Sequence, residues 1–147
     1  MRILGWGFIL LGMLLLASSV RAQSLTNKAL AWINSNLIDE HANCYVFYKI
    51  SEEGLNRDTT KPKVNYASIT DSLINKMLIL GKHSSIKEET ILAKIELSMK
   101  DLKNQMGGDF KNYSIILNKY GQFCKDLVEK PDNRMKHWAD RVIKENR

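Results

Sequence analysis

The sequence is poor in the residues that mark several specialised protein classes. Its 147 residues include only two cysteines, two prolines and eight glycines. So few prolines and glycines exclude a collagen-like chain and a Pro/Gly-rich disordered chain. Two cysteines are too few for a small domain that is held together mainly by disulfide bonds. With 44% hydrophobic and 26% charged residues, the composition is that of an ordinary globular domain with a buried core.

The first 22 residues have the pattern of a secretory signal peptide. Arg2 provides a positive start, and residues 3–17 form an apolar run without a charge. We expect cleavage between Ala22 and Gln23, which leaves one helical domain over residues 23–147. An uncleaved membrane anchor is the alternative, but a run of about 15 residues is shorter than the roughly 20 needed to span a bilayer. We therefore expect a periplasmic or secreted protein that does not span the membrane after cleavage.

An exported chain with two cysteines is expected to join them. An even, minimal count in an oxidising compartment favours one disulfide bond. A metal site is one alternative, but the sequence has no C-x-x-C or H-x-x-x-H spacing. A reactive thiol is another, but no unpaired cysteine is left for it. We predict a bridge between Cys44 and Cys124, which closes a loop of about 80 residues and stabilises the fold by about 4 kcal/mol.

The hydrophobic pattern of the remaining chain is helical, without clean alternation of the strand type. Short links between the later helices favour antiparallel neighbours. The expected fold is an all-α, single-domain bundle of four to five helices with one disulfide, after a cleaved signal peptide. The helices are expected over about residues 25–55, 68–80, 85–106, 109–128 and from Pro131 onward.

Local signals mark where these helices begin and end. We expect Gly81 to end the second helix in a left-handed conformation. Ser85 and Glu88 have the spacing of a capping box at the start of the third helix. Gly107-Gly108 is expected to end the third helix, and Asp109 to cap the fourth.

Patterns for catalysis, metal binding or cofactor binding are sparse. We expect His41, His83 and His137 to be surface or structural residues, because no ferritin-like Glu-x-x-His spacing accompanies them. No G-x-S-x-G turn and no phosphate loop occurs. Asp39 and Glu40 stand beside His41, but adjacent helical residues point about 100° apart and do not converge on one substrate atom. We therefore expect a non-enzymatic protein without catalytic residues, metal or cofactor.

Aromatic residues are densest around the first cysteine. Tyr45, Phe47 and Tyr48 surround Cys44 and point in several directions from one helix. Core packing around the disulfide is one interpretation. The other is an exposed apolar patch, which makes these three aromatic residues the candidate partner surface.

The chain has a mild excess of positive charge. Its formal net charge is +6, and the lysines are spread along the chain among acidic residues. No dense stripe of Lys and Arg with stacking aromatics occurs, so we expect no binding to nucleic acid. The partner that we expect is another protein, whose identity the charge pattern does not specify.

Two segments carry a resemblance to known proteins. The segment CYVFY at residues 44–48, and YGQFC at residues 120–124 followed by Pro131, Arg134 and Trp138, resemble small exported bacterial all-helical proteins of unknown function. The resemblance implies a periplasmic helical protein in which the two cysteines pair, and it implies no catalytic residue. In size, leader and helical build, the chain is also similar to periplasmic immunity proteins that neutralise toxins of the type VI secretion system.

The function that we expect is that of an exported, non-enzymatic helical binding protein: an inhibitor, an immunity protein or an envelope accessory factor. The first alternative is a carrier of a small apolar ligand such as a lipid or haem, since helix bundles can enclose cavities. The candidate lining residues are Met77, Met99, Met106, Tyr45 and Tyr48. The second alternative is a hydrolase that uses Asp39, Glu40 and His41.

Overall fold

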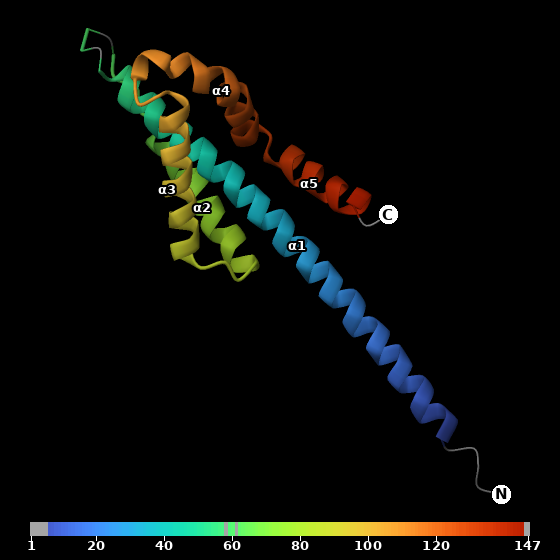
Figure 1. Cartoon of the computed structure of the whole chain (residues 1–147). Coiled ribbons are helices and arrows are strands. Elements are labelled where there is room, and N and C mark those ends of the chain that lie inside the picture. Colours follow the sequence, from blue (N-terminus) through green and yellow to red (C-terminus); the bar gives the residue numbers. More distant parts are fainter. Residues whose placement is uncertain (1–5, 58, 61, 146–147) are drawn as a thin grey trace, which may run out of the picture.

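The computed structural model of the chain (Figure 1) is built from α-helices around one long helix, α1. It describes the backbone of residues 6–57, 59–60 and 62–145, and the side chains of these residues from Thr26 onward. In these ranges there is no strand, which confirms the all-α prediction. The helices are α1 (Trp6–Leu55), α2 (Ala67–His83), α3 (Glu88–Gln105), the short 3₁₀ helix η1 (Phe110–Asn112), α4 (Tyr113–Glu129) and α5 (Pro131–Glu145).

The predicted leader and its cleavage site fall in residues 1–22, outside the residues whose side chains are described, so they stay predictions. Helix α1 begins at Trp6 and not near Leu25, where the first helix was expected to start. The apolar run that precedes Leu25 is rich in leucine and free of proline, so it continues the helix. Where side chains are described, no helix combines the length and the apolar character needed to cross a membrane.

The other helices pack along the C-terminal half of α1, which contacts α2, α3, α4 and α5. Helices α2 and α3 lie along one side of α1, and α4 and α5 lie along another (Figure 1). This arrangement follows from the apolar residues of α1, which recur at helical spacing and are buried on more than one face. Helix α1 is therefore the central element of the bundle.

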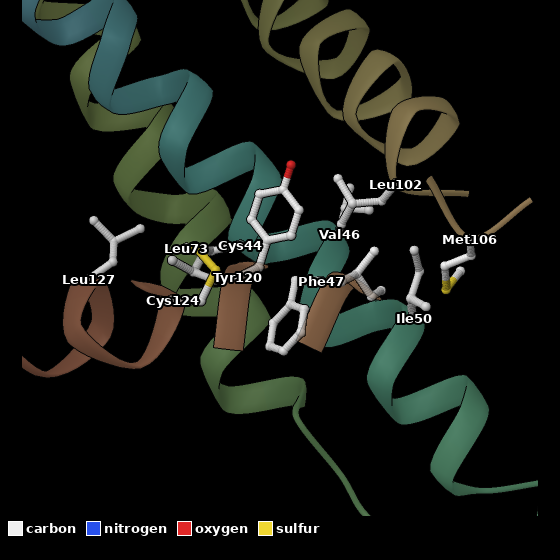
Figure 2. Packing of buried hydrophobic residues seen from close by; sticks show 11 residues of the cluster. Cys44, Val46, Phe47, Ile50, Leu73, Leu102, Met106, Tyr120, Cys124 and Leu127 are labelled. Atoms are coloured by element: carbon white, nitrogen blue, oxygen red, sulfur yellow. A yellow bond between two sulfur atoms is a disulfide. The ribbon is translucent and has the colours of Figure 1, made fainter. Parts of the chain in front are cut away.

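The larger part of the core surrounds the disulfide bond. Cys44 of α1 and Cys124 of α4 are joined, with their Cα atoms 5.2 Å apart and both side chains fully buried. Figure 2 shows the bridge among the apolar side chains that pack around it. The predicted bridge is thus confirmed. The buried cluster consists of Cys44, Val46, Phe47, Ile50, Leu73, Leu102, Met106, Ile116, Tyr120, Cys124 and Leu127.

A second, smaller cluster lies where α1 meets α2 and α3. Its buried members are Ile38, Ala42, Met77 and Ile91, which are at most 1% exposed. The two clusters together bury the apolar stripes of α1, α2 and α3, whose burial from water drives helix packing.

The turn between α2 and α3 differs from the prediction. Gly81 does not end α2, which continues to His83, and Ser85 has the positive φ of 56° that was expected at the glycine. The backbone N–H of Ile86 donates to the carbonyl of Gly81 at 2.9 Å, which closes the turn as a Schellman motif. Gly81 sits in a tight space, because a Cβ atom there would lie 2.7 Å from Cδ1 of Ile91 and 3.0 Å from the backbone oxygen of Ile86.

The same turn also replaces the predicted capping box. The residue that caps α3 is Lys87, without a side-chain hydrogen bond, and Ser85 is already committed to the turn. The next turn agrees with the prediction in part. Gly107 and Gly108 follow α3 with positive φ, as expected, and the Asp109 side chain accepts from the backbone N–H of Lys111 at 2.9 Å. Asp109 caps η1 and not the fourth helix as predicted, because that short 3₁₀ turn precedes α4, whose N-cap is Asn112 without a side-chain hydrogen bond.

We predict that the variant Cys44→Ala/Cys124→Ala unfolds at a lower denaturant concentration than the oxidised protein. The bridge joins residues 80 apart in sequence, and the loss of such a cross-link costs about 4 kcal/mol. The measurement is equilibrium unfolding followed by circular dichroism. A reductant added under denaturing conditions should remove the difference between the two proteins, and coincident curves without reductant would contradict the prediction.

Candidate functional site

Helix α5 is held against the bundle by polar and aromatic contacts, since none of its residues is buried. The Glu40 carboxylate of α1 is only 9% exposed. It accepts hydrogen bonds from Nε of Arg134 at 3.0 Å and from Nε1 of Trp138 at 3.1 Å, and a second Arg134 nitrogen completes a two-bond ion pair. We call these three residues the Glu40 clasp.

Aromatic rings extend the clasp on both sides. The guanidinium of Arg134 lies over the ring of Phe123 in α4, with 5.2 Å between the guanidinium carbon and the ring centroid. The rings of Trp138 and Trp32 meet edge to face with centroids 5.3 Å apart. The clasp therefore fixes α5 to both α1 and α4.

A groove opens where α5 passes α1 and α2. Its volume is about 210 Å³, and it is open to solvent along one side. Apolar side chains dominate its walls, and Ile79 and Met135 are 57% and 40% exposed. The lining residues are Leu37 and His41 of α1, Lys76, Ile79 and Leu80 of α2, and Pro131, Asp132 and Met135 of α5.

His41 lies at the wall of this groove and is only 4% exposed. Its Nδ1 donates to the backbone carbonyl of Leu37 at 2.7 Å, which leaves the lone pair of the neutral ring on Nε2. In the described chain, every fully buried side-chain nitrogen or oxygen has a hydrogen-bond partner. No hydrogen bond to Nε2 is found among the described residues, so this nitrogen is not fully buried, and the groove is the open space that His41 lines.

Burial lowers the pKa of His41 below its ordinary value of 6.5. The ammonium of Lys76 also lowers this pKa, against the raising effects of the hydrogen bond to Leu37 and of the Glu40 charge. His41 is therefore a neutral hydrogen-bond acceptor near pH 7. The groove combines apolar walls, one acceptor on the mostly buried His41, one cation at Lys76 and the exposed carboxylate of Asp132.

The aromatic residues that we considered as a partner surface do not form an exposed patch. Phe47 is 5% exposed and belongs to the core around the disulfide, and Tyr45 and Tyr48 are half-buried against that core. The Tyr48 ring packs on Tyr66, with centroids 5.2 Å apart. The burial of Phe47 and the partial burial of Tyr45 and Tyr48 favour the core-packing interpretation of these residues.

The three polar neighbours on α1 are used separately. Asp39 forms an ion pair with Lys94 of α3, Glu40 belongs to the clasp, and His41 faces the groove. They do not converge on one point, as the helical spacing predicted. His83 and His137 are exposed. Within the described ranges, no three His, Cys, Asp or Glu side chains are grouped so as to hold a metal ion.

The methionines that we considered as a ligand lining are part of the packed core. Met77 is fully buried, Met106 is 5% exposed, and Met99 packs against the same core. The methionine that lines the groove is Met135 of α5, which was not among these candidates. Sequence patterns did not identify the groove, because its walls come from three helices and only their packing brings them together.

We predict that the variant Glu40→Ala loosens α5 without unfolding the bundle. The change removes the shared acceptor of the clasp and leaves Arg134 and Trp138 without their carboxylate. Because the Arg134 side chain is 24% exposed, we expect a cost below that of a fully buried ion pair, which is about 3–5 kcal/mol. Hydrogen exchange measured by mass spectrometry should show faster exchange across α5, and unchanged protection around the disulfide. The matched control is Glu145→Ala, which breaks an exposed pair with Arg141 on the same helix. Equal exchange of α5 in both variants would contradict the prediction.

We predict that the protein becomes less stable as the pH falls below about 6.5, and that protonation of His41 accounts for part of this loss. The pKa of His41 is lower in the folded protein than in the unfolded chain, so the unfolded chain binds the proton first and stability is lost with decreasing pH. Denaturant unfolding at pH 7.5 and 5 should show a smaller loss for His41→Gln than for the wild type. The control His137→Gln changes an exposed histidine and should keep the wild-type dependence.

Comparison with known proteins adds no relative to this picture. No protein-family model matches the chain, and neither a curated protein nor a solved structure matches it. The resemblance to small exported helical proteins stays an expectation. The candidate site therefore rests on the groove alone.

Proposed function

We propose that the protein is an exported, non-enzymatic helical binding protein that recognises another protein, as an inhibitor, an immunity protein or an envelope accessory factor. The leader-like pattern of residues 1–22 supports export. The buried bridge between Cys44 and Cys124 supports it as well, because disulfide bonds persist in oxidising compartments.

The groove between α1, α2 and α5 is the observation that carries the proposal. It presents apolar walls to solvent on a body that a disulfide bond holds together. Ile79 of α2 and Met135 of α5 both line it and are both exposed. Exposed apolar surface bordered by charged residues is typical of interaction sites. In this protein Lys76 and Asp132 supply those charges.

A carrier of a small apolar ligand is the second candidate, and the same groove supports it. Ligand pockets usually enclose most of the ligand and measure about 300–1,000 Å³. The groove is smaller, at about 210 Å³, and open on one side. Its shape suits a side chain that projects from a larger partner better than a ligand that has to be sealed from water.

We predict that a photo-crosslinking amino acid at position 79 or 135 captures a partner protein in the cell envelope of the source organism. Both positions border the groove and are exposed, so the substitution keeps the fold. The control is the same amino acid at position 97, since Leu97 of α3 is 67% exposed and lies outside the groove. Gel mobility and mass spectrometry identify the adducts.

The comparison between positions is the decisive result. An adduct of defined mass at positions 79 and 135, absent at position 97, is expected. Adducts of equal yield at all three positions would mean unspecific contact, and no adduct at the groove would contradict recognition through this surface.

A further inference from the structure

We propose that the groove binds the C-terminal residue of a partner polypeptide. The last side chain, which is apolar, lies between Ile79 and Met135; the terminal carboxylate pairs with Lys76; and the backbone N–H of the last residue donates to Nε2 of His41. This inference rests on the proposed function, because it names the part of a partner protein that the groove recognises.

The size and shape of the groove favour one residue at a chain end. A cavity of about 150 Å³ holds one benzene molecule, so the groove of about 210 Å³ accommodates one large apolar side chain with its backbone groups. A whole helix or a long segment does not fit inside it. The open side lets the preceding residues of the partner leave the groove toward solvent.

The accepting nitrogen of His41 selects a ligand that carries an N–H group. Nδ1 of His41 is already committed to the Leu37 carbonyl, and Nε2 of the neutral ring accepts but does not donate. A ligand without a donor leaves this nitrogen unpaired when water is displaced, which is unfavourable. The last residue of a polypeptide carries an N–H group next to its carboxylate.

The charges around the groove favour a carboxylate beside that donor. Lys76 has no ion-pair partner among the described residues, and its charge reaches the imidazole of His41. The N-terminal end of α5, which begins at Pro131, also faces the groove and carries the positive end of the helix dipole. Asp132 is exposed to solvent and is available to groups upstream of the carboxylate.

Two other ligand classes fit these groups less well. An alkyl carboxylate such as octanoate pairs with Lys76 and fills the apolar walls, but it offers no N–H group to His41. An alkylamine faces the cation of Lys76 and finds only the exposed carboxylate of Asp132. The C-terminal residue of a polypeptide offers all three contacts: an apolar side chain for the walls, an N–H group for His41 and a carboxylate for Lys76.

The test measures the binding of four probes to the oxidised protein. Binding is followed by calorimetry and by the NMR signals of Met135 and of the His41 ring. The first is the peptide acetyl-Gly-Gly-Leu with a free carboxylate. The second is its C-terminal amide, and the third is an analogue in which an ester oxygen replaces the leucine N–H. The fourth is octanoate. The acid peptide should bind saturably, and the amide and the ester should each bind about tenfold more weakly, as expected for one lost charge-assisted or buried hydrogen bond.

A variant of Lys76 tests the contact with the carboxylate. Lys76→Met should weaken binding of the acid peptide about tenfold, and leave binding of the amide unchanged. Its matched control is Lys82→Met on the same helix, since Lys82 is exposed and does not line the groove. This control should bind both peptides as the wild type does.

Three outcomes would overturn the inference: equal binding of acid and amide, binding of octanoate as tight as that of the acid peptide, or no binding of the acid peptide. The proposed function fails separately. Adducts confined to positions 79 and 135, together with equal binding of acid and amide, would keep recognition of a protein through the groove and remove the role of the C-terminal carboxylate.

Discussion

The bond between Cys44 and Cys124 is the constraint on which the arrangement of the later helices depends. It attaches α4 to the packed half of α1 in the centre of the core. Only Lys130 separates α4 from α5, so the place of α4 also determines where α5 begins. Pro131 and Asp132 reach the groove for this reason. A covalent bond in the core thus positions a surface site built from another part of the chain.

Helix content, the bridge and most helix ends followed from the sequence, because apolar spacing, glycine pairs and a minimal cysteine count act locally or have few alternatives. Gly81 was misinterpreted for a physical reason. A glycine near a helix end is typical of a terminator, but here the absent Cβ makes room for Ile91. That requirement comes from a contact between two helices, and a single-helix pattern does not contain it.

The candidate site was beyond sequence reasoning for a related reason. Glu40 and Arg134 are 94 residues apart in the chain, and nothing in the local pattern of either residue indicates the other. The dense aromatic segment around Cys44 suggested a partner surface, but its residues pack into or against the core. The groove consists of ordinary side chains, and its distinctive feature is one imidazole nitrogen that the packing leaves without a partner.

The two-cysteine composition restricts the errors that oxidative folding can make. A chain with four cysteines has three ways to pair them, whereas this chain has one internal pairing, Cys44 with Cys124. No internally scrambled isomer exists. The wrong product is therefore a bridge between two molecules. It forms before folding brings each cysteine to its partner, which lies 80 residues away in the sequence. Dilution thus favours the native product, because internal pairing does not depend on concentration and pairing between molecules does.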